Sequence, residues 1–97
     1  MDKELEILRK QIDDADKKLI EAYEERLDAV YKIAYLKADS GIEIEDKKRE
    51  KEILERVRNM AKPEYRRAVK ALYEEILKIS KENQKRVIDF VNKEDIE

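Results

Sequence analysis

The stretch LRKQIDDADKKLIEAYEERLDAVYKIAYL, residues 8–36, decides the fold. It contains neither glycine nor proline, and its apolar residues recur in alternating steps of four and three, the heptad spacing of a helix that packs along a seam. One position of this seam is occupied by a charged residue, Arg26. The spacing predicts one long helix from about Lys3 to about Asp39. The apolar members of the seam are Leu8, Ile12, Ala15, Leu19, Ala22, Ala29, Ile33 and Leu36.

Two shorter helices are predicted after this stretch. Ser40-Gly41 ends the first helix, because glycine just beyond a periodic segment is a common stop signal. Asp46 is a suitable N-cap for a second helix that runs to about Ala61, and Pro63 suits the first turn of a third. The chain is therefore predicted to be all-α, with three helices, one of them very long, in a single domain over residues 1–97.

The amino-acid composition argues against several kinds of protein and functional site. Charged residues make up 49% of the chain but the net charge is only −2, which does not fit a polycation that binds nucleic acid. Cysteine and histidine are absent, which argues against disulfides, a thiolate or imidazole metal site and a histidine base. No apolar run approaches the roughly 20 residues of a membrane span, and the N-terminus lacks the apolar segment of a signal peptide. We expect a cytoplasmic protein without metal or cofactor; dense mixed charge is typical of thermophilic and of engineered sequences alike.

Arg26 requires a negative partner, because a buried and unpaired guanidinium is very costly. A salt bridge to a glutamate on a neighbouring helix would supply one. A ligand is the alternative: Lys37 lies eleven residues on, nearly three turns, so it faces the same way about 16 Å further along the axis. Two long cationic side chains can lean together from that distance and clamp one small anion. Lys37 alone also fits a solvated lysine at a helix C-terminus.

The two shorter helices place polar residues where they could face this pair. Asp46, Arg49 and Glu50 share a face at the start of the second helix. They form either a capping cluster with a local ion pair, or a source of one more cation and of a carboxylate that accepts a hydroxyl. Ser80 and Gln84 replace apolar residues in the third helix, which either sets helix register or directs polar groups into a shared cavity.

If Arg9 is functional, it must serve the site of a second chain. It lies seventeen residues before Arg26, about 25 Å along the axis, so one small ligand cannot touch both in the same chain. An antiparallel pairing of two first helices would bring Arg9 of one chain toward Arg26 of the other. It would also cover apolar length, because a helix of about 54 Å is longer than two short helices of the same chain can cover.

Together these positions resemble the all-helical, AroQ-type chorismate mutase family, over nearly the whole chain. Each motif is weak alone, but five in order at compatible spacings form a strong signal. The chain departs from the familiar pattern at Tyr35, where smaller residues are usual, and in the short segment around Pro63; neither difference touches a motif residue. The motifs are Leu8-Arg9-x-x-Ile12, Glu25-Arg26, Lys37, Asp46-x-x-Arg49-Glu50 and Ser80-x-x-x-Gln84.

The resemblance implies an intertwined homodimer with two equivalent sites, each completed by the partner subunit's Arg9. It also implies a reaction, the Claisen rearrangement of the dicarboxylate chorismate to prephenate, on the route to phenylalanine and tyrosine. The residues expected to hold carboxylates or add positive charge are Arg9, Arg26, Arg49 and Ser80. Those expected to donate to the ether oxygen are Lys37 and Gln84. Those expected at the ring hydroxyl are Asp46, through its backbone, and Glu50, and the expected apolar walls are Ile33, Ile53 and Leu77.

Two other functions stay open at this point. An isochorismate pyruvate lyase on the same scaffold would use a similar cationic pocket, although Glu50, placed for the ring hydroxyl of chorismate, favours the mutase. A non-catalytic helical dimerisation module would explain the heptads and the surface charge. It would not explain why Arg26, Ser80 and Gln84 interrupt apolar seams.

Overall fold

The computed structural model describes residues 2–41 and 43–96, without the side chains of residues 94–96. Its elements are α1 (Asp2–Ser40), α2 (Lys47–Met60), the short 3-10 helix η1 (Pro63–Tyr65) and α3 (Arg66–Ile96). Every regular element of this part of the chain is a helix, and α1 has 39 residues. The prediction of an all-α chain with three helices, one of them very long, is confirmed.

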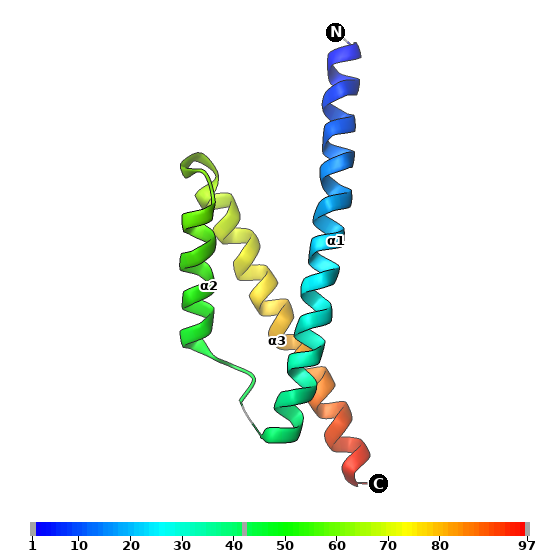
Figure 1. Cartoon of the computed structure of the whole chain (residues 1–97), viewed down its shortest axis with the longest axis vertical. Coiled ribbons are helices and arrows are strands. Elements are labelled where there is room, and N and C mark those ends of the chain that lie inside the picture. The colour runs from blue at the N-terminus through cyan, green and yellow to red at the C-terminus, as the bar shows by residue number, and fades with distance from the viewer. Residues whose placement is uncertain (1, 42, 97) are drawn as a thin grey trace.

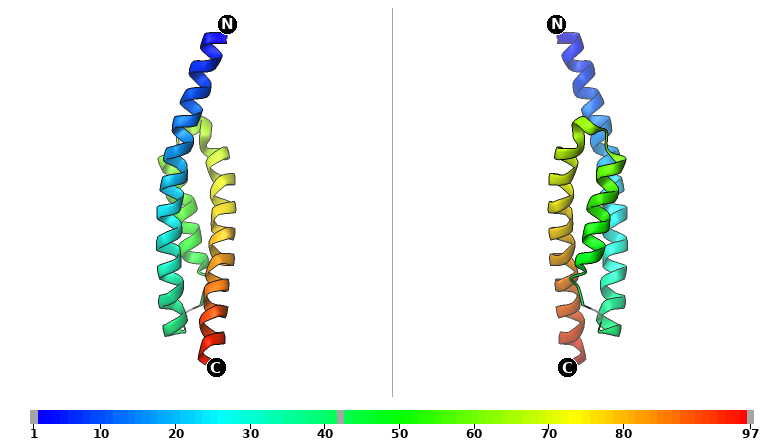
Figure 2. Two further views of the ribbon diagram at one scale, coloured as in Figure 1. Left: turned by 90° about the vertical axis from the view of Figure 1, so that its right-hand side faces the viewer. Right: turned by 90° about the vertical axis from the view of Figure 1, so that its left-hand side faces the viewer.

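The helices form an elongated body of 63 × 28 × 14 Å. α2 and α3 are joined as a hairpin through η1, and the N-terminal end of α1 extends beyond this hairpin (Figures 1 and 2). α3 packs against both other helices, whereas α1 and α2 make no close backbone contact within the described residues. α3 is therefore the helix that joins α1 to α2.

Local signals explain where the helices end and begin. Gly41 has a φ of 71° and its N–H donates to the carbonyl of Lys37 at 2.9 Å, which ends α1 in the left-handed conformation that glycine tolerates best. Asp46 is the N-cap of α2, because its Oδ1 accepts from the backbone N–H of Arg49 at 3.0 Å. Pro63 opens η1 instead of α3 itself, so the third α-helix begins only at Arg66.

The buried core is small and belongs mainly to the hairpin. Its main cluster consists of Ile53 and Val57 from α2 and Leu77 from α3, and Val87 of α3 is also buried. From α1, Val30 and Ala34 are buried. These two residues lie one position beyond the seam members Ala29 and Ile33, so α1 meets its own chain with a face next to the predicted seam.

The seam itself is exposed in the single chain. Leu8, Ile12 and Leu19 each expose more than half of their surface, and Leu36 exposes 68%. All residues from 2 to 22 are exposed. The prediction that the other two helices of the chain leave part of the apolar seam of α1 exposed is therefore confirmed. No helix in the described ranges has the length and apolar character needed to cross a membrane.

Candidate functional site

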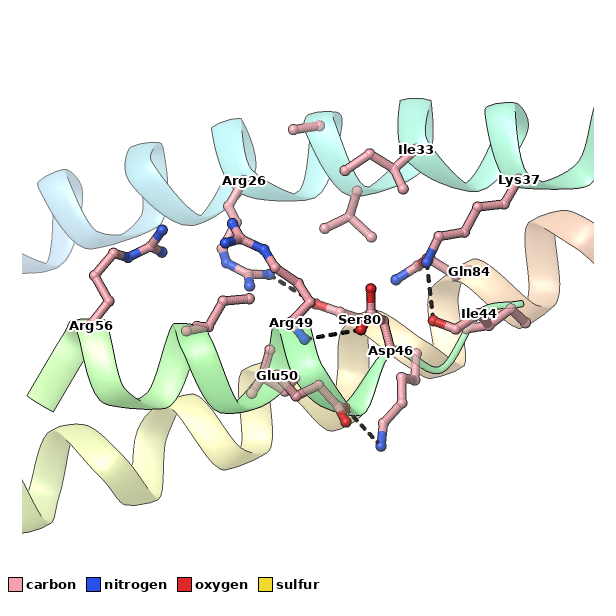
Figure 3. Close-up of a pocket in the computed structure, with 15 residues that line it drawn as sticks. Arg26, Ile33, Lys37, Ile44, Asp46, Arg49, Glu50, Arg56, Ser80 and Gln84 are labelled. Atoms are coloured by element: carbon pink, nitrogen blue, oxygen red, sulfur yellow. Dashed lines mark hydrogen bonds and ion pairs between the residues drawn. The ribbon is translucent and has the colours of Figure 1, made fainter. Parts of the chain in front are cut away.

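A cleft of about 430 Å³ lies between α1 and α2, with α3 beneath it (Figure 3). Its walls carry residues from all three helices and from the connector that precedes α2. The cleft brings together every predicted site residue except Arg9, although the motifs lie far apart in sequence. The predicted residues that line it are Arg26, Ile33, Lys37, Asp46, Arg49, Glu50, Ile53, Leu77, Ser80 and Gln84.

The cleft carries an excess of positive charge, whereas the chain as a whole has a net charge of −2. Both carboxylates of the lining are already engaged: Asp46 caps α2 and Glu50 pairs with Lys81. Within the described ranges no carboxylate forms an ion pair with Arg26 or Lys37. The unmatched charge suits an anionic ligand. The cationic lining residues are Arg26, Lys37, Arg49, Arg56 and Lys81.

Arg26 is held by a hydroxyl and not by the glutamate that was one expectation for it. Its Nη1 donates to Oγ of Ser80 at 2.9 Å, and Ser80 is only 5% exposed. A hydroxyl orients the guanidinium without neutralising it. Because a guanidinium has five N–H donors, Arg26 keeps donors for a ligand after this bond is made.

Lys37 is fixed by two acceptors. Its Nζ donates to the carbonyl of Ile44 and to Oε1 of Gln84, both at 3.0 Å. An ammonium has three donors, so one N–H remains for a ligand. Gln84 is 9% exposed, and with its oxygen bound to Lys37 its amide NH₂ is left as a donor. The two side chains thus present neighbouring donors in the cleft (Figure 3).

Two charged residues of the cleft, Arg56 and Lys81, were missed by the sequence analysis. Arg56 lies seven residues after Arg49, two turns along the same face of α2, which is a signal that the spacing contained. Lys81 follows Ser80 directly, and its Nζ lies 3.0 Å from Oε1 of Glu50. This hydrogen bond is the main reason that the pKa of Lys81 is raised above its ordinary value.

Arg9 lies outside the cleft, near the N-terminal end of α1. Its side chain is exposed. The helix geometry places it about 25 Å from Arg26 along the axis, so the single chain does not bring the two arginines together. A role for Arg9 at the site of a second chain stays a prediction.

Comparison with known proteins gives one family match. The family model described as chorismate mutase type II matches residues 8–85. This range begins at Leu8 and includes every predicted site residue from Arg9 to Gln84. No curated protein sequence and no solved structure matches the chain.

Because Arg26 and Lys37 have no carboxylate partner in the described part of the chain, we predict that a small dicarboxylate binds in the cleft. Malonate should raise the melting temperature more than sodium chloride does at equal ionic strength. At ten times its dissociation constant, a bound anion adds about 1.4 kcal/mol to the free energy of unfolding, or about 7 °C for a chain of this size. Arg26→Met should lose most of this gain. Lys70→Met, on the outer face of α3, should keep it; an equal gain in all three proteins would show that malonate acts outside the cleft.

Proposed function

The chain belongs to the chorismate mutase type II family, isomerases that convert chorismate to prephenate, and we propose that the cleft between α1 and α2 is where it performs this reaction. The observation that carries the proposal is the unmatched charge of Arg26 and Lys37 in a cleft of about 430 Å³. Chorismate is a compact dicarboxylate, so it supplies the negative charge that the cleft lacks.

The rearrangement suits a site built from fixed donors. One carbon–oxygen bond breaks and one carbon–carbon bond forms within the substrate, and no proton passes to or from the protein. The enzyme has two tasks: to hold the enolpyruvyl side chain over the ring in a chair-like geometry, and to stabilise the negative charge that develops on the ether oxygen. Charged and neutral hydrogen-bond donors can perform both tasks.

Lys37 and Gln84 are the proposed donors to the ether oxygen. Lys37 is supported in this role because Ile44 and Gln84 already hold its ammonium at 3.0 Å. A donor that is oriented before the reaction needs no reorganisation as charge develops, which is the condition under which such donors accelerate a reaction most. The remaining N–H of Lys37 and the NH₂ of Gln84 would then meet the same oxygen.

Arginines are the proposed carboxylate ligands. Arg26 can bind a carboxylate through two parallel N–H bonds, and its bond to Ser80 at 2.9 Å supports a fixed orientation. Arg49 adds positive charge from α2. The partner subunit's Arg9 would bind the second carboxylate.

Glu50 is the proposed acceptor for the ring hydroxyl. Its Oε1 pairs with Lys81, and no hydrogen bond occupies its Oε2 within the described part of the chain. Asp46 supports the position of Glu50 by capping α2. Its backbone carbonyl accepts from the N–H of Glu50 at 3.0 Å, which supports a shared role of the Asp46 backbone at the hydroxyl. The proposed apolar walls are Ile33, Ile53 and Leu77, all of which line the cleft.

A homodimer is proposed because α1 cannot bury its apolar seam within its own chain. Its N-terminal half exposes the apolar seam residues Leu8, Ile12 and Leu19. A second copy with an antiparallel α1 would bury these residues, at about 25 cal/mol for each Å² removed from water. The same pairing would carry Arg9 toward the cleft of the other subunit, so one contact would both stabilise the fold and complete the site.

The isochorismate pyruvate lyase reaction is the nearest alternative. It would use the same cations, so the charge of the cleft does not discriminate. Glu50 supports the mutase, because a carboxylate acceptor with a free oxygen suits the ring hydroxyl of chorismate. The dimerisation module is less well supported, because it gives no reason for an unneutralised Arg26 and Lys37 in one cleft.

Lys37→Ala should lower kcat for chorismate by about 100- to 1000-fold, the usual cost of losing one preorganised donor. The measurement is the decrease in chorismate absorbance, with circular dichroism and size-exclusion chromatography to show that the variant folds and assembles as the wild type does. Lys32→Ala is the matched control, since Lys32 is an exposed lysine of α1, and it should keep normal turnover. Near-normal turnover of Lys37→Ala would contradict the mechanism.

Arg9→Ala and Arg26→Ala should each be nearly inactive, yet a mixture should recover activity. After joint unfolding and refolding of equal amounts, half of the dimers are mixed and each has one intact site, so about a quarter of wild-type activity is expected. Each variant refolded alone is the control. If the mixture shows no more activity than the separate variants, the two arginines do not meet across a dimer.

A further inference from the structure

Lys81 forms a bridge between three segments of the chain. Its Nζ lies 3.0 Å from Oε1 of Glu50 on α2 and 3.7 Å from Oε1 of Glu45 in the connector. The other ion pairs of the described residues each lie within a single helix. The bridge of Lys81 is thus the one ionic contact in this part of the chain that joins separate elements, and it does so at the wall of the cleft.

The ion pair with Lys81 engages only one of the two carboxylate oxygens of Glu50. The side chain of Glu50 is 23% exposed, less than any other carboxylate in these ion pairs. Lys81 holds one of its two oxygens, and the other has no hydrogen bond within the described residues. Glu50 is therefore anchored at one oxygen and available at the other.

We propose that Lys81 is a positioning residue for substrate binding: by holding Oε1 of Glu50 it presents Oε2 as the acceptor for the ring hydroxyl. This inference rests on the proposed function, since it concerns the hydroxyl of chorismate. A free glutamate at the start of α2 would sample several rotamers and would lose that freedom when the substrate binds. The ion pair removes that cost in advance.

Loss of the ion pair between Lys81 and Glu50 is expected to raise KM. The contact between Glu50 and the hydroxyl is present in the bound substrate and in the transition state alike, because the hydroxyl takes no part in the bond changes. Such uniform binding affects KM with little change in kcat. A purely structural role of Lys81 would instead lower the fraction of folded enzyme, and with it the apparent kcat, and would leave KM unchanged.

Lys81→Met should raise KM for chorismate about fivefold, the effect of one more side chain that must be immobilised on binding, with kcat nearly unchanged. Lys81→Arg should stay close to wild type, because arginine can still bridge to Glu50. Lys70→Met is the matched control: it removes a lysine of the same helix whose partner, Glu74, is also on α3. Its KM should not change.

A double-mutant cycle with Glu50→Ala separates this role from direct contact with the substrate. If Lys81 acts through Glu50, adding Lys81→Met to Glu50→Ala should not raise KM further. Independent, multiplying effects would show that Lys81 binds the substrate itself, which would overturn the inference. An inactive wild type would refute the proposed function, whereas an active wild type whose KM is unaltered by Lys81→Met would refute only this inference.

Discussion

Hydrogen bonds from two cations of α1 hold the site together. Arg26 donates to Ser80, and Lys37 donates to Gln84 and to the connector at Ile44. Within the described residues these are the side-chain hydrogen bonds that join α1 to the rest of the chain. The acceptors are neutral, so the helices are joined while both positive charges persist. The free protein therefore holds in place a charge that a ligand has still to neutralise.

This arrangement explains why so small a chain leaves so much of itself exposed. The hairpin of α2 and α3 has a core centred on Ile53, Val57 and Leu77, and α1 adds only Val30 and Ala34 to the buried set. α1 must stand apart from α2 to leave the cleft open, so it cannot bury its apolar seam within its own chain. In the proposed dimer a second copy of the chain would bury the seam and bring Arg9 to the cleft, which would link the stability of the dimer to its activity.

Much of this site could be predicted from sequence because its signals are local. Gly41 and Asp46 mark helix ends through backbone conformation and capping, and helical spacing puts Arg26 and Lys37 on one face. The inward face of α1 was harder to predict, since the seam at Ala29 and Ile33 is more regular than the buried pair Val30 and Ala34 beside it. Heptad spacing shows that a face is apolar, but not which neighbour covers it.

Arg56 could have been found from its spacing after Arg49, but Lys81 could not be recognised from the sequence. Long cationic side chains occur throughout this chain, and their sequence positions do not show which ones reach across a cleft. Ser80 and Gln84 stand out as polar residues in an apolar seam, whereas a lysine beside Ser80 looks like part of a solvated face. Only the positions of α2 and the connector relative to α3 bring Lys81 within 3.0 Å of Glu50.

The most direct test of this account is to incubate the wild-type protein with chorismate and identify the product as the absorbance of chorismate falls. Fixed donors around a bound dicarboxylate, with an acceptor at the ring hydroxyl, predict that chorismate is consumed and that prephenate is the product. Formation of pyruvate with a hydroxybenzoate, or no consumption of chorismate by the folded protein, would contradict it.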